Sequence, residues 1–120
     1  MERISIPVSD MNPAVTLNLE DGIWFQGKSM MENASHFYAP ILSWVENRIN
    51  INGEKLEITI DLSYFNSSSA KQLLKMLMVV DESLLNATVK WYYPKENDIL
   101  CDRGKELEIM VDLEFEYIPK

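Results

Sequence analysis

Three stretches of the chain alternate between apolar and polar residues, and this pattern constrains the fold more than any other feature. The stretches are Leu56 to Leu62, Ala87 to Tyr93 and Leu107 to Tyr117. Alternation with a period of two is typical of a strand with one buried face. Parallel strands that are covered on both faces show continuous apolar runs instead. The chain is therefore expected to form a two-layer α/β domain, with helices on one face of a mixed sheet of about five strands and a polar, acidic opposite face.

The first part of the chain predicts a β-hairpin. Val15 to Leu19 and Ile23 to Gln26 continue the alternation on either side of Asp21-Gly22, a dipeptide that favours tight hairpin turns. Residues 1–13 contain two prolines and are expected to form a short strand followed by a loop.

Apolar residues at helical spacing predict the helices. One helix is expected between Asn33 and Asn50, with its regular part beginning near Ala39, because Pro40 costs about 3 kcal/mol inside a helix. An amphipathic helix is expected from Ser69 to Leu85. The polar segment 94–104 leaves room for a short helix. Trp24, Trp44 and Trp91 lie at positions that favour packing roles.

Length, charge and cysteine content limit the class of protein. With 120 residues the chain is expected to form one domain over residues 1–120. The net charge of −8 disfavours general nucleic-acid binding, because a phosphate backbone would be repelled. No apolar run approaches the roughly 20 residues that span a bilayer. The lone Cys101 and the lack of a signal-peptide pattern in residues 1–5 indicate a cytoplasmic protein.

The sequence shows no pattern of catalytic, metal-binding or cofactor-binding residues. His36 is the only histidine, and Cys101 has no second cysteine. None of the four glycines belongs to a phosphate-binding loop, and the acidic residues 96, 98 and 102 lack the ligand spacing of a calcium-binding loop. These observations predict a protein that is not an enzyme and that has no metal or cofactor. A small enzyme or ligand-binding domain is a less favoured alternative.

The serines at positions 67–69 lie where a buried strand is expected to turn into a helix. Ser69 with Gln72 fits a capping box, with Ser69 as the N-cap. A phosphate group here would be tolerated, because helix N-termini favour anions by about 0.3–1 kcal/mol. It would add about −1.5 to −2 charges to the surface. The residues alone are consistent with a helix cap and with a phosphorylation switch.

Four segments resemble those of the SiaC family of bacterial regulatory phosphoproteins. Residues 64–71 (Tyr-Phe-Asn-Ser-Ser-Ser-Ala-Lys) resemble the family's Tyr-Phe-Asn-Thr-Ser-Ser-x-Lys signature. Residues 27–33 resemble its Gly-x-Ser-x-Pro-Glu-Asn segment, with Met31 in place of proline. Residues 37–44 resemble its Phe-Tyr-x-Pro-φ-φ-x-Trp stretch, in which φ is apolar, and residues 91–93 resemble its Trp-Tyr-Tyr segment. The segments follow the family's order.

The resemblance implies a non-enzymatic protein in a partner-switching circuit. Such proteins are phosphorylated by a serine/threonine kinase and dephosphorylated by a PP2C-type phosphatase. Their unphosphorylated form binds and activates a diguanylate cyclase, which raises cyclic di-GMP and promotes biofilm formation. The family's fold is similar to that of anti-sigma-factor antagonist (STAS-like) domains. An anti-sigma-factor antagonist that controls a sigma factor is therefore the alternative function.

The resemblance also implies the site residues. The family's phosphoacceptor threonine corresponds to Ser67, and serine keeps the hydroxyl group that phosphotransfer requires. Ser68 and Ser69 are alternative acceptors. The residues expected to contact the partner are Tyr64, Phe65, Asn66, Ser67, Ser68 and Lys71.

Overall fold

A computed structural model describes residues 3–18, 20–47, 55–83 and 86–120. These residues form a six-stranded mixed sheet with the strands in chain order. The strands are β1 (Ile4–Ile6), β2 (Ala14–Asn18), β3 (Gly22–Ser29), β4 (Lys55–Phe65), β5 (Asn86–Tyr93) and β6 (Glu114–Pro119). The pairs β1–β2 and β2–β3 are antiparallel, and the pairs from β3 to β6 are parallel. The predicted hairpin is confirmed as β2–β3.

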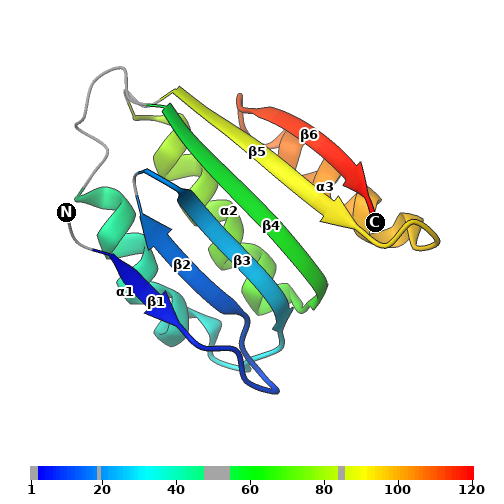
Figure 1. The fold of residues 1–120 in the computed structure, drawn as a ribbon, viewed down its shortest axis with the longest axis horizontal. Helices are drawn as coiled ribbons and strands as arrows, with labels where there is room; N and C mark the ends of the chain where they lie inside the picture. The colour runs from blue at the N-terminus through cyan, green and yellow to red at the C-terminus, as the bar shows by residue number, and fades with distance from the viewer. Residues whose placement is uncertain (1–2, 19, 48–54, 84–85) are drawn as a thin grey trace.

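Three helices connect the parallel strands and cover one face of the sheet (Figure 1). They are α1 (Ala34–Glu46), α2 (Ser67–Asp81) and α3 (Asp98–Ile109). Each connection leads to the next strand in the same direction across the sheet. Because such connections are almost always right-handed, all three helices lie on the same face. The predicted two-layer α/β architecture is confirmed, with six strands where about five were expected.

The core lies between this helical layer and the apolar side of the sheet. The alternating residues of β4 are buried, and they face the buried residues of α2: Leu56, Ile58, Ile60 and Leu62 on the strand, and Leu73, Met76, Leu77 and Val80 on the helix. Burial of each such side chain stabilises the fold by roughly 1.5–3 kcal/mol. This packing holds the end of β4 and the start of α2 in a fixed arrangement.

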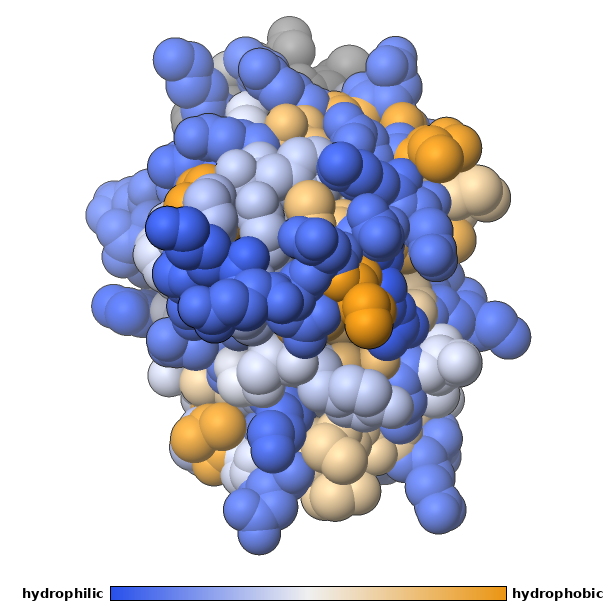
Figure 2. Space-filling model, turned by 90° about the vertical axis from the view of Figure 1, so that its right-hand side faces the viewer, coloured by the Kyte–Doolittle hydropathy of each residue, from blue (hydrophilic) through white to orange (hydrophobic). Residues whose placement is uncertain are grey.

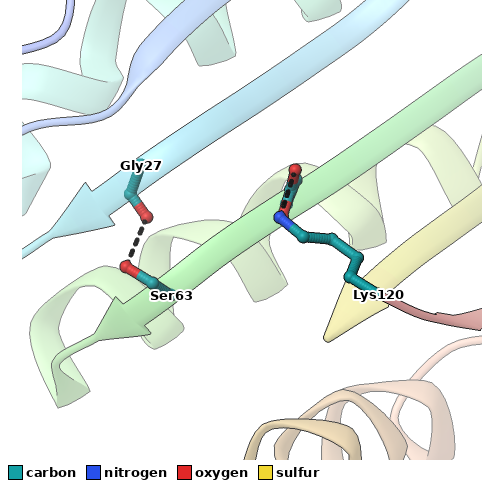
Figure 3. Close-up of polar contacts among 4 residues, drawn as sticks. Gly27, Ser63 and Lys120 are labelled. Carbon is teal, nitrogen blue, oxygen red and sulfur yellow. Dashed lines mark hydrogen bonds and ion pairs between the residues drawn. The ribbon is translucent and has the colours of Figure 1, made fainter. Parts of the chain in front are cut away.

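The opposite face of the sheet is polar, as predicted. Lys90 pairs with Glu57 at 3.3 Å. Lys120 pairs with Asp61 at 2.8 Å, and Figure 3 shows this ion pair of Lys120. Trp44 and Trp91 are buried, but Trp24 lies on this open face with 43% of its surface exposed. The prediction of a packing role is therefore wrong for Trp24, whose indole N–H donates to the Asp21 carbonyl at 3.0 Å.

The predicted last strand from Leu107 to Tyr117 is wrong in its first part. Leu107 and Ile109 belong to α3, and β6 begins only at Glu114. Leu100, Gly104 and Leu107 are buried at helical spacing, whereas Ile109 is 82% exposed. The helical stripe that packs on the sheet thus overrides the short alternating pattern.

The predicted start of the first helix is also wrong. The helix begins at Ala34 and continues through Pro40, which lies exposed inside α1. Proline removes one backbone hydrogen bond there, but the buried stripe that includes Tyr38 and Ile41 holds the helix against the sheet. The predicted end of the second helix at Leu85 is wrong, because α2 ends at Asp81 and Glu82 is its C-cap. Residues 48–50, the end of the range predicted for the first helix, lie outside the described residues. No helix in the described ranges is both long and apolar enough to cross a membrane.

Candidate phosphorylation and partner-binding site

The serine turn lies at the junction of β4 and α2, where one residue, Asn66, separates the strand from the helix. Asn66 is the N-cap: its side-chain Oδ1 accepts a hydrogen bond from the Ser69 backbone N–H at 2.9 Å. The predicted capping box of Ser69 with Gln72 is therefore wrong, and α2 begins at Ser67. Ser69 does not cap the helix because its hydroxyl is used inside the protein.

Ser69 is fully buried in a chain of hydroxyl groups. Its Oγ donates to the Ser29 carbonyl at 3.0 Å and accepts from Ser29 Oγ at 2.6 Å. Ser29 Oγ in turn lies 2.8 Å from the Tyr38 hydroxyl. Burial raises the pKa of Tyr38 to about 12. These bonds join α2 to β3 and α1, so a kinase would reach the Ser69 hydroxyl only if the junction opened.

Ser68 and Asn66 connect the N-termini of α1 and α2. Ser68 is half-buried, and its Oγ accepts from the Ala34 backbone N–H at 3.4 Å. The side chain of Asn33, the N-cap residue of α1, makes no capping hydrogen bond to this helix. The Ser68 hydroxyl accepts from the start of α1 instead. Asn66 donates through its Nδ2 to the Met31 carbonyl at 3.0 Å and through its backbone N–H to the Ser29 carbonyl at 3.0 Å.

Ser67 differs from both neighbouring serines. It is exposed at the first position of α2, and its hydroxyl makes no hydrogen bond within the described residues. Tyr64 is 47% exposed at the end of β4, and Lys71 is exposed one helical turn beyond Ser67. Of the residues predicted to contact a partner, these three present their side chains most openly.

Phe65 has a supporting position in the junction. Its side chain is 1% exposed and packs edge-on against Trp91, with ring centroids 5.7 Å apart. The Arg103 guanidinium lies 3.9 Å from the Phe65 ring centroid, and Nη1 donates to the Phe65 carbonyl. Sequence patterns do not predict Arg103, Ser29 or Tyr38 as site residues. Ser29 and Tyr38 lie in segments that resemble those of the family, but these segments are distant in sequence from the serine turn. Arg103 lies in none of these segments.

The other chemically reactive residues are not brought together. His36 is exposed on α1, and Cys101 is half-buried on α3. Among the described residues, no group of three His, Cys, Asp or Glu side chains could hold a metal ion. A shallow depression of about 400 Å³ lies on the open sheet face, lined by Arg3, Ala14, Thr16, Asp21, Trp24 and Gln26. Its lining contains neither histidine nor cysteine.

The side of the molecule that carries β6 and α3 is mainly hydrophilic. Figure 2 shows apolar side chains there as separate spots between charged and polar residues. The exposed apolar residues of this region are Ile99, Ile109 and Met110. Isolated apolar residues of this kind are normal on a protein surface. They do not compete with the serine junction as a candidate partner-binding site.

These features define a small α/β domain with an accessible serine where a central strand turns into a helix. The chain matches the SiaC family of regulatory phosphoproteins over residues 6–120, and it belongs to this family. An uncharacterized protein of Pseudomonas aeruginosa strain UCBPP-PA14 is 26% identical over 110 residues, covering 88% of this chain and 87% of that protein.

Solved structures show the same fold. Apo-SiaC from Pseudomonas aeruginosa superposes with a TM-score of 0.86 at 22% identity, covering 98% of this chain and 99% of that chain. SiaC from the same organism, in a complex with the diguanylate cyclase SiaD of which it is the activator, superposes with a TM-score of 0.87 at the same identity and coverage. The fold inferred from the resemblance is thus confirmed.

Proposed function

We propose that this chain is a non-enzymatic regulatory phosphoprotein that activates a diguanylate cyclase when unphosphorylated. Phosphorylation of Ser67 blocks the binding. Membership of a family of regulatory phosphoproteins supports the proposal. A solved complex of a protein with the same fold and a diguanylate cyclase supports the choice of partner.

The exposure of Ser67 is the observation that carries the proposal. A kinase needs a hydroxyl that is accessible and not held in another interaction. The Ser69 hydroxyl is buried and bonded to Ser29, and the Ser68 hydroxyl accepts from the first N–H of α1. Ser67 combines an exposed hydroxyl with the first position of a helix, where backbone N–H groups and the helix dipole favour an added anion.

The phosphate would change the surface and leave the fold intact. It would add about −1.5 to −2 charges between Tyr64 and Lys71, the exposed neighbours of Ser67. A partner surface that fits the neutral serine would meet a bulky dianion. A serine/threonine kinase would add the group, and a PP2C-type phosphatase would remove it.

A charge substitution tests the proposal. Ser67→Asp should weaken binding to the diguanylate cyclase by about tenfold or more, because it places a carboxylate at the contact surface. Ser43→Asp is a matched control, since Ser43 is exposed on α1 and the charge change is the same. Affinity would be measured by calorimetry and folding by circular dichroism. Equal affinity of Ser67→Asp and wild type would contradict the role of Ser67.

The alternative function, an anti-sigma-factor antagonist, shares the switch and differs in the partner. A pull-down with the unphosphorylated protein separates the two outputs. Recovery of a diguanylate cyclase supports the proposal, whereas recovery of an anti-sigma factor would replace it with the alternative.

A further inference from the structure

Arg103 is a cation at the serine junction, and it has no carboxylate partner among the described residues. Its side chain is half-buried and crosses from α3 to the end of β4, where it covers the Phe65 ring at 3.9 Å. Its Nη1 donates to the Phe65 carbonyl. No ion pair of Arg103 is present in the part of the chain that the structure describes. The guanidinium is thus fixed by stacking and by one hydrogen bond, and no described carboxylate pairs with its charge.

This lack of a partner is informative because carboxylates are abundant in the chain. The protein has 19 acidic and 11 basic residues. Partly buried arginines are usually paired, since an unpaired charge loses hydration without compensation. A guanidinium has five N–H donors in a planar fork, and the fork matches the oxygens of a phosphate group. The Phe65 carbonyl uses one donor, so further donors are available to an anion.

The contacts of Arg103 with Phe65 hold its guanidinium near the start of α2. Phe65 precedes Ser67 by two residues, so their Cα atoms are separated by at most about 7 Å. The guanidinium contacts both the ring and the carbonyl of Phe65. A phosphate on Ser67 projects its oxygens further from the backbone than the hydroxyl does. The fork and the phosphate therefore lie at the same end of α2.

We propose that Arg103 binds the phosphate of phosphorylated Ser67 with the N–H groups that the Phe65 carbonyl leaves unused. This inference rests on the proposed function, because it takes Ser67 as the acceptor. It adds a binding residue from a different helix, and it connects α3 to the switch. Lys71 and Lys28 are other nearby cations, since Lys28 lies opposite Tyr64 in the β3–β4 pairing. Both are exposed, and solvent screens their charges more strongly.

The ionisation of the phosphate measures this pairing directly. Phosphoserine would be placed at position 67 during translation, so that no kinase is required. The second pKa of the phosphate, ordinarily about 6, would be followed by phosphorus NMR. Arg103→Gln should raise this pKa by about half a unit or more relative to the unsubstituted chain, because a nearby cation favours the dianion.

Lys105→Gln is the matched control, because it removes the same charge from the same helix. Lys105 Nζ lies 5.7 Å from the Tyr117 ring centroid, on the side of β6. It should leave the phosphate pKa almost unchanged. Equal pKa values in Arg103→Gln and Lys105→Gln would overturn the inference. Arg103→Lys, which keeps the charge and loses the fork, should give an intermediate pKa.

A second measurement needs no substitution and covers the case in which Arg103→Gln fails to fold. The guanidinium N–H resonances of Arg103 should shift when Ser67 carries a phosphate, and unchanged resonances would overturn the inference. These measurements separate a failure of this inference from a failure of the proposed function. If the proposed function were wrong, the phosphorylated chain would bind the cyclase as tightly as the unphosphorylated chain. The pKa and resonance measurements do not depend on that binding.

Discussion

The two serines at either end of the turn should respond in opposite ways to alanine. Ser69 is fully buried, and its hydroxyl bonds twice to Ser29, once to Oγ at 2.6 Å and once to the carbonyl at 3.0 Å. Ser67 is exposed at the first position of α2. Ser69→Ala should therefore destabilise the fold, and Ser67→Ala should abolish phosphorylation with little effect on stability.

The structure sets the size of the effect. In Ser69→Ala the Ser29 carbonyl keeps one partner, because it still accepts from the Asn66 backbone N–H at 3.0 Å. The hydroxyl groups of Ser29 and Tyr38 can still form one hydrogen bond with each other, but one of their two O–H donors then has no acceptor. An orphaned buried donor costs about 1–3 kcal/mol, so a loss of roughly 2 kcal/mol is expected. Ser67→Ala should stay within about 0.5 kcal/mol of wild type.

Urea denaturation followed by far-UV circular dichroism measures the difference. With an m-value of about 2 kcal/mol/M for a domain of this size, Ser69→Ala should lower the midpoint by roughly 1 M. Ser67→Ala should leave the midpoint nearly unchanged. If Ser69→Ala were as stable as wild type, or if the two variants lost equal stability, the assignment of Ser69 as the structural serine would be refuted.

Two further predictions concern the packing around the junction. Gly104→Ala should lower the free energy of unfolding, measured by urea denaturation, by up to about 2 kcal/mol. The added Cβ would lie 2.7 Å from Cε2 of the buried Trp91. Overpacking costs about 1–3 kcal/mol, which exceeds the roughly 1 kcal/mol that alanine gains over glycine in helix propensity. The exposed Asp102→Ala is its control, and a Gly104→Ala variant as stable as wild type would refute this packing argument. The free energy of unfolding should fall as pH rises from about 10 to about 12, because burial raises the pKa of folded Tyr38 to about 12 while the unfolded chain releases the proton near pH 10. Tyr38→Phe should reduce this pH dependence. An unchanged dependence in that variant would contradict the assignment of the effect to Tyr38.

The architecture could be predicted because its signals are local. The alternation in β4 and β5 and the apolar stripe of α2 each lie within one element, and together they predict a sheet covered on one face. The end of α3 could not be predicted in this way. Leu107, Ile109 and Val111 alternate like a strand, and only packing on the sheet shows that Leu107 continues the stripe of Leu100 and Gly104.

The place of the serine turn in the fold could be predicted from the sequence, but its hydrogen bonds could not. The junction of a strand with a serine-rich helix start is visible in the sequence, whereas the choice of N-cap depends on distant residues. Asn66 and Ser69 are both good capping residues. Ser29, 40 residues away in the sequence, binds the Ser69 hydroxyl and leaves the cap to Asn66. Arg103 is 38 residues from the carbonyl that it binds, so no local pattern indicates it.

The hydrogen bonds of the junction favour a switch that changes charge and keeps the fold. Asn66, Ser68 and Ser69 connect the start of α2 to residues 29–34 through five hydrogen bonds, and each contributes about 0.5–1.5 kcal/mol. A phosphate that had to open the turn would work against all of them. A phosphate on Ser67 breaks none, because the Ser67 hydroxyl takes no part in this set, and the helix N-terminus favours the added anion. The two forms of the protein would then share one structure, and a partner would distinguish them by the dianion at the start of α2.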